Sequence, residues 1–215
     1  MRVGGIVLCG GRSSRMGRSK AWLPFGDELL LPRVVRILGM AVGPIVVVAA
    51  AKQDMPPLPT GVEVVHDAVH DKGPLGGLAA GLAALTGRAE VAYLSACDVP
   101  LLRPAFVRHV VDALTSERGR SQSWDAAIPH IGGYYHPLAA AYRLSVRDAV
   151  LSLLAANRLR TQLLLDGVST RVLNAHEFAG VDPEFESLRN VNTPDDYAAV
   201  LRDYNAPCRS DPQAL

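Results

Sequence analysis

A glycine-rich loop with a concentration of basic side chains follows the first apolar segment of the chain. Two glycines open it, and four cations follow within nine residues: Gly10, Gly11, Arg12, Arg15, Arg18 and Lys20. Glycines let backbone N–H groups come close to a ligand, and guanidinium and ammonium groups bind phosphate. We interpret the loop as a phosphate-binding site. The alternative is a solvated basic surface loop.

The loop does not fit the two commonest phosphate-binding motifs. A P-loop ends in Gly-Lys-Ser/Thr, whereas Gly17 is followed by Arg18 and Ser19. A dinucleotide fingerprint, Gly-x-Gly-x-x-Gly, opens directly into a helix, whereas Gly10-Gly11 is followed by a long polar stretch. The sequence therefore supports neither kinase-like nor Rossmann oxidoreductase binding.

Aspartates follow two other apolar segments. Asp98 comes just after residues 91–96, where a carboxylate and phosphate oxygens together could hold Mg²⁺. The alternative for Asp98 is a turn-capping role before the helix that begins near Pro104. Asp67 ends the segment 62–66, with Asp71 as a nearby competitor, and either could merely terminate a strand.

These side chains need a fold that brings them together, and the apolar pattern predicts one. Short β-branched runs alternate with segments of three- and four-residue apolar spacing, which is typical of a parallel sheet covered by helices. We expect strands at 3–8, 45–50, 62–66, 91–96 and 126–129, and helices at 32–40, 75–85 and 104–115. Beyond these we expect a hairpin turn at 131–135, strands at 138–142 and 170–173, and helices at 146–157 and from Pro194 onward. This predicts an α/β three-layer domain in which loops after parallel strands share one crevice.

Composition limits the classes of function. Of 215 residues, 49% are hydrophobic and 20% charged, as in globular proteins, and 22 Lys+Arg against 21 Asp+Glu indicate no nucleic-acid or membrane-surface binding. The longest apolar runs are shorter than the roughly 20 residues of a membrane span, and the first residues do not resemble a secretory signal. We therefore expect a cytoplasmic protein. The three cysteines, Cys9, Cys97 and Cys208, lack zinc-site spacing.

The basic loop resembles the signature of nucleotidyltransferases of the molybdenum cofactor guanylyltransferase type, Leu-Ala-Gly-Gly-x-x-x-Arg-Met-Gly-x-x-Lys. The matching residues are Leu8, Gly10, Gly11, Arg15, Met16, Gly17 and Lys20. Cys9 stands where the family has alanine, and Ser19 stands where it usually has aspartate. Related cytidylyltransferases more often have Leu-Ala-Ala-Gly, so Gly10 favours the guanylyl branch.

Three further motifs occur in the order of this family. Cys97-Asp98-Val99-Pro100 is similar to its Cys-Asp-x-Pro, His136-Pro137-Leu138 matches its His-Pro-Leu, and residues 190–195 match its Asn-Val-Asn-Thr-Pro-Glu/Asp. The family also has an aspartate at the place of Asp67. The alternative for Asn192-Thr193-Pro194 is a simple helix start.

The resemblance implies a set of roles for these residues. The phosphates and nucleotide would be bound by Leu8, Cys9, Gly10, Gly11, Arg15, Lys20, Asp67 and Asp98. Arg15, Lys20 and Asp98 would be catalytic, with Asp98 on Mg²⁺, and Asp67 would accept from guanine N1–H and N2–H₂. His136, Asn190 and Asn192 would bind the pterin.

The resemblance also implies a fold and an activity. We expect a three-layer, Rossmann-like nucleotidyltransferase fold with a mostly parallel sheet, forming one domain over residues 1–204. Its GTP-binding part would be about 1–100, its pterin-binding part about 101–204, and 205–215 would be a flexible tail. The expected reaction transfers GMP from GTP to the phosphate of molybdopterin, with transient contacts to cofactor-donating or molybdoenzyme-maturation proteins. The alternatives are a relative that uses CTP or another phosphorylated acceptor, and a non-catalytic nucleotide-binding module.

Overall fold

The computed structural model describes residues 1–10, 19–67, 72–116 and 123–206. In this part of the chain, eight strands form one sheet, with the order β10-β7-β9-β6-β1-β4-β5 and β8 paired to β7. The strands of this sheet are β1 (Val3–Leu8), β4 (Ile45–Ala49), β5 (Glu63–His66), β6 (Val91–Ala96), β7 (Ala126–Ile131), β8 (Tyr134–Tyr135), β9 (Ala139–Arg143) and β10 (Thr170–Asn174). A separate hairpin joins β2 (Pro24–Phe25) to β3 (Glu28–Leu29).

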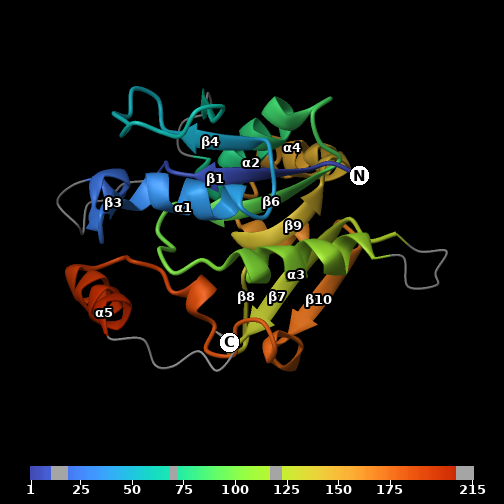
Figure 1. Cartoon of the computed structure of the whole chain (residues 1–215). Coiled ribbons are helices and arrows are strands. Elements are labelled where there is room, and N and C mark those ends of the chain that lie inside the picture. Colours follow the sequence, from blue (N-terminus) through green and yellow to red (C-terminus); the bar gives the residue numbers. More distant parts are fainter. Residues whose placement is uncertain (11–18, 68–71, 117–122, 207–215) are drawn as a thin grey trace.

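Helices cover both faces of the sheet, as the apolar pattern predicts (Figure 1). They are α1 (Leu30–Gly39), α2 (Gly73–Leu85), α3 (Pro104–Thr115), α4 (Arg147–Ala155) and, beside the β2–β3 hairpin, α5 (Pro194–Asn205). One buried cluster joins α1 and α3 to one face of the sheet, and a second joins α2 and α4 to the other. The predicted three-layer α/β class is therefore confirmed.

The central strands are parallel and the second half of the sheet is mixed. β1 pairs in parallel with β4 and β6, and β4 with β5, so their carboxyl ends meet at one edge. β9 runs antiparallel between β6 and β7. The expected elements coincide with the observed ones to within two residues at each end, whereas the β2–β3 hairpin is not among those expected.

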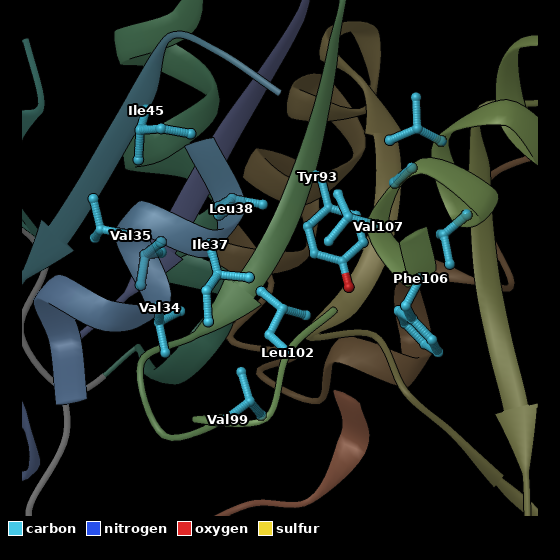
Figure 2. Packing of buried hydrophobic residues seen from close by; sticks show 14 of the residues in the cluster. Val34, Val35, Ile37, Leu38, Ile45, Tyr93, Val99, Leu102, Phe106 and Val107 are labelled. Atoms are coloured by element: carbon cyan, nitrogen blue, oxygen red, sulfur yellow. The ribbon is translucent and has the colours of Figure 1, made fainter. Parts of the chain in front are cut away.

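Packing is close on both faces of the sheet. Figure 2 shows Tyr93 of β6 between the side chains of α1 and those of α3, including Phe106 and Val107. On the opposite face, a Cβ on Gly81 of α2 would lie 2.6 Å from Ile6 Cγ2, so only a glycine lets the helix approach β1 this closely. This contact fixes α2 relative to the central strands.

The last helix is attached to the first half of the chain. Leu23, Phe25, Leu30, Val191 and Val200 form a small buried cluster that joins α5 to the β2–β3 hairpin and the start of α1. The segment just before α5 is thereby held beside the first strands of the fold. In the described part of the chain, no helix is long and apolar enough to cross a membrane.

Candidate active site

Three side chains from distant parts of the sequence meet at the carboxyl edge of the central strands. Lys20 begins the short 3₁₀ helix η1 (Lys20–Trp22), Asp98 follows β6, and Asn192 precedes α5. Lys20 Nζ donates to Asp98 Oδ2 over 2.7 Å and to Asn192 Oδ1 over 2.8 Å. We name Lys20, Asp98 and Asn192 the charged cluster. Its Lys20 and Asp98 side chains are only 16% and 13% exposed, so solvent screens their charges weakly.

The two carboxylate oxygens of Asp98 differ in their surroundings. Its Oδ1 atom is buried and has no hydrogen-bond partner among the described residues, while Oδ2 is bound by Lys20. A buried carboxylate oxygen without a partner is unfavourable unless a donor or a cation binds it. In the described ranges, no three His, Cys, Asp or Glu side chains could hold a metal among themselves. The residues present therefore fit a cation held by one carboxylate together with ligand oxygens.

The start of the basic loop is held by backbone contacts. Cys9 N–H donates to Val48 O over 2.8 Å, and a Cβ on Gly10 would lie 3.4 Å from Ala50 N. Gln53 ties the two strand ends together, because its Nε2 donates to Cys9 O and its Oε1 accepts from Ala50 N, each over 3.0 Å. Leu8, Cys9 and Gly10 thus lie at the carboxyl end of β1. Gly11 and Arg15, with Arg12 and Arg18, lie outside the described residues.

The two cysteines of the site interact with each other. The thiol of Cys97 donates to the Cys9 sulfur, which lowers the pKa of Cys9. The same hydrogen bond, together with complete burial, raises the pKa of Cys97 well above its usual value. Cys97 therefore stays a neutral thiol beside Asp98 and adds no charge to the cluster.

Asp67 lies further along the same edge, after β5. Its N–H donates to Ala49 O over 3.0 Å, and its Oδ2 lies 2.7 Å from the place a Cβ on Gly76 would take, so the carboxylate faces the first turns of α2. Neighbouring strands are about 4.8 Å apart, so Asp67 is about 10 Å from the end of β1. An extended nucleotide could span this distance. The competing Asp71 lies outside the described residues.

A cavity of about 240 Å³ adjoins the charged cluster. It lies between β6, the start of β9 and the segment before α5, and both His136 and Asn190 line it. Burial lowers the pKa of His136, so that its ring is neutral at pH 7. Asn190 is linked to the charged cluster through Val191, whose N–H donates to Asp98 O over 2.9 Å.

The structure separates the three residues expected to bind the pterin. His136 and Asn190 share the cavity, whereas Asn192 is bound to Lys20. Asn192 also belongs to a helix start, because Asp196 Oδ2 accepts from its N–H over 3.0 Å and Thr193 caps α5. The hydrogen bond from Asn192 N–H is the main cause of a lowered pKa of Asp196, and the contacts with Thr193 add to it. The helix-start interpretation of this motif is therefore confirmed, and the Asn192 side chain contacts Lys20 from that helix start.

Two supporting residues were missed by the sequence analysis. Gln53 follows β4 and joins the ends of β1 and β4 through its contacts with Cys9 and Ala50. Asp182 is completely buried, accepts from the N–H groups of Glu186 and Ser187, and so shapes the turn that leads to Asn190. Nothing in the sequence around Asp182 separates it from an ordinary turn aspartate.

Comparison with known proteins identifies relatives over most of the chain. The sequence matches the MobA-like NTP transferase domain over residues 5–177. A probable molybdenum cofactor guanylyltransferase of Mycobacterium avium (strain 104) is 34% identical over 206 residues, which are 94% of this chain and 96% of that protein.

Solved structures show the same fold. Molybdopterin-guanine dinucleotide biosynthesis protein A from Archaeoglobus fulgidus matches 95% of this chain and 98% of its own, with a TM-score of 0.73 and 22% identity. Rv0371c from Mycobacterium tuberculosis H37Rv in complex with manganese matches 94% of this chain and 99% of its own, with a TM-score of 0.63 and 19% identity. At these identities the likeness concerns the fold alone.

Proposed function

We propose that this chain, which belongs to the MobA-like NTP transferase family and is therefore a nucleotidyltransferase, transfers GMP from GTP to the phosphate of molybdopterin. An oxygen of the acceptor phosphate attacks the α-phosphorus of GTP in line, the bond to the β-phosphate oxygen breaks, and pyrophosphate leaves. No protein nucleophile is needed. Residues up to about 100 bind GTP, and residues from about 101 to 204 bind the acceptor.

The charged cluster is the observation that carries this proposal. Lys20 and Asp98, both expected to be catalytic, lie 2.7 Å apart although 78 positions separate them in the sequence. A module that only binds a nucleotide has no need of a buried carboxylate with an oxygen left over. An enzyme that brings two anions together has such a need, because it must hold cations at the reacting phosphates.

The chain's own residues position the two anions and stabilise charge. The described contacts use two of the three N–H donors of Lys20, so its ammonium has a further donor for a phosphate oxygen. Arg15 and the amides of Gly10 and Gly11 would hold the rest of the triphosphate. Asn192 keeps the Lys20 side chain at the junction between the two substrates. Holding both reactants in line supplies much of the acceleration.

Asp98 would hold Mg²⁺ through Oδ1, its buried oxygen without a partner in the described chain. When bound, this cation neutralises charge that develops on the α-phosphate and on pyrophosphate. The phosphate oxygens of GTP would complete its coordination, as is usual for magnesium in such sites.

Asp67 would select guanine. Its carboxylate can accept from guanine N1–H and N2–H₂, and cytosine lacks this donor pair. A site built to accept from this donor pair discriminates against a base that lacks it, so GTP should be preferred over CTP. His136 and Asn190, which line the cavity, would bind the pterin.

The test is pyrophosphate release with GTP, ATP, CTP and UTP, each with and without molybdopterin. We expect release with GTP that depends on the acceptor, and Asp67→Asn should reduce the GTP/CTP ratio of kcat/KM more than it weakens triphosphate binding. Asp71→Asn is the control. A change in this ratio caused by Asp71→Asn alone would assign base selection to the other aspartate, and a wild-type preference for CTP would refute the guanylyl proposal.

A further inference from the structure

We propose that Tyr135 is a specificity-determining residue, on whose face the flat pyrimidine ring of the pterin stacks inside the cavity. This inference rests on the proposed function and deepens it, since it names the group that recognises the acceptor's ring. Neither the sequence motifs nor the expected site residues include Tyr135.

The cavity has the wrong chemistry for a phosphate and the right chemistry for a neutral ring. Its walls carry aliphatic, aromatic, hydroxyl and amide groups, and no Lys, Arg, Asp or Glu is among the lining residues. The lining residues are Tyr93, Ser95, Ala96, Val99, Leu102, Tyr135, His136, Pro137, Leu138, Ala139, Thr161, Ser187, Leu188 and Asn190. Ligand cavities of this kind use apolar walls for burial and a few polar groups for orientation. With about 240 Å³, the cavity suits a ring system rather than a whole nucleotide.

The cavity adjoins the place where the acceptor's phosphate must react. Ala96 and Val99, on either side of Cys97 and Asp98, contribute to its wall. Asn190 contributes from the opposite side, next to Val191, whose N–H is bound to Asp98 O. A pterin ring held in the cavity therefore has its phosphate arm beside the charged cluster, and this sets the orientation of the acceptor.

Tyr135 is held as a fixed aromatic surface in this wall. It pairs with His130 across the β7–β8 hairpin, and the two rings lie 4.6 Å apart between centroids, tilted by 44°. Gly132 and Gly133 make the tight turn of the hairpin with φ of +60° and +82°, values that side chains rarely allow. A ring fixed in this way loses little conformational freedom when a ligand stacks on it.

Neighbouring side chains can read the edges of the stacked ring. His136 is the next residue and is neutral at pH 7 because burial lowers its pKa. A neutral imidazole donates from one ring nitrogen and accepts at the other. The Asn190 side chain adds both donors and an acceptor. A pterin presents both kinds of group along its edge, so the wall matches it in shape and in hydrogen bonding.

The chain offers a matched control for this assignment. Tyr134 precedes Tyr135 on the same short strand, yet it is 71% exposed and is not part of the cavity wall. Successive side chains on a strand point to opposite faces, which explains the difference. Any effect of changing the hairpin as a whole should appear equally at both tyrosines.

The experiment measures KM for molybdopterin and KM for GTP in wild type, Tyr135→Ala, Tyr135→Phe and Tyr134→Ala, with equilibrium titration of molybdopterin alone as a second readout. Base stacking on an aromatic ring typically changes binding about tenfold or more, so Tyr135→Ala should raise KM and Kd for molybdopterin by about that factor. KM for GTP should stay within about twofold. Tyr135→Phe, which keeps the ring, and Tyr134→Ala should resemble wild type.

Several results would overturn the inference. Unchanged molybdopterin binding by Tyr135→Ala would exclude stacking, and equal losses in Tyr135→Phe would assign the effect to the hydroxyl instead. Equal losses in Tyr134→Ala would assign it to the hairpin. If Tyr135→Ala does not fold, as judged by thermal unfolding, Tyr135→Leu takes its place with the same expectation. A different result would refute the proposed function itself: wild-type enzyme that does not consume molybdopterin at all.

Discussion

The two halves of the candidate site, on either side of the end of β6, differ in their chemistry. The charged cluster holds a lysine, an aspartate and an asparagine within hydrogen-bonding distance, and its Lys20 and Asp98 side chains are largely shielded from water. The cavity, whose wall includes Val99 next to Asp98, has no charged side chain among its walls. A single substrate with a phosphate at one end and a neutral ring at the other would match both halves. On the proposed function, this boundary would separate the phosphate of the acceptor from its ring.

The end of one strand, β6, contributes to both halves of the site. β6 ends in Ala96, which lines the cavity, and two residues later Asp98 belongs to the charged cluster. The segment 190–192 repeats the arrangement, because Asn190 lines the cavity while Asn192 binds Lys20. The two segments are joined by the hydrogen bond from Val191 N–H to Asp98 O. Changes on one side should thus affect phosphate chemistry, and changes on the other should affect ring binding.

The largest effect is expected from Asp98→Asn. Replacing the carboxylate removes the anionic ligand of the cation, and the charge stabilisation at such sites amounts to several kcal/mol. We expect kcat to fall by at least about 10³-fold while the circular dichroism spectrum stays unchanged. Near-normal turnover of the folded variant at saturating Mg²⁺ would remove Asp98 from the mechanism.

Lys20→Ala should have the next largest effect. It removes a charge-assisted contact to phosphate and should lower kcat/KM for GTP by about 100-fold. Lys72→Ala is the control, because Lys72 Nζ donates to Asn157 Oδ1 instead of to Asp98, and this variant should leave kcat/KM within about twofold. Equal losses in both variants would mean that any nearby lysine supports catalysis through its general positive charge.

Ring binding should depend on pH through His136. Burial lowers the pKa of His136 below its ordinary value of 6.5, so the ring is neutral at pH 7 and takes up a proton only below pH 6.5. Protonation puts a cation into a cavity without a carboxylate, so KM for molybdopterin should rise between pH 6.5 and pH 5. His136→Asn should abolish this rise. A rise that persists in His136→Asn would have another origin.

The smallest effect is expected from Thr193→Ala, which weakens the support of the charged half. The Thr193 side chain accepts from Asp196 N–H over 3.1 Å and caps α5. Loss of such a cap costs about 1 kcal/mol of unfolding free energy, equivalent to a Tm lower by about 2–4 °C. Thr193→Ser should restore the Tm, because serine caps equally well. A Tm unchanged in the alanine variant would show that the cap contributes nothing to stability.

Much of the fold was predictable because local patterns determine it. The strands at 3–8 and 91–96 are continuous apolar runs, and their predicted bounds are those observed. Lys20 and Asp98 were identified from motifs at the ends of these strands. The contact of Asn192 with Lys20 was not predictable, since 172 positions separate the two and only the docking of α5 brings them together.

Other parts of the site left no local signal. Gly132 and Gly133 indicated a turn, but which of the two following tyrosines lines a cavity depends on the register between β7 and β8. Gln53 acts through hydrogen bonds to Cys9 O and Ala50 N, and glutamine is common in loops for many reasons. Residues that act through long-range packing can therefore be identified only from the structure.

The most direct test of the central claim follows the α-phosphorus of GTP. The enzyme is incubated with molybdopterin, Mg²⁺ and GTP that is labelled at either the α- or the γ-phosphate. The products are separated and identified by mass spectrometry. We predict that the α-label enters a product that joins guanosine to the pterin, one for one with pyrophosphate that carries the γ-label. Recovery of the α-label in free GMP or GDP, with no guanylated pterin formed, would contradict the account.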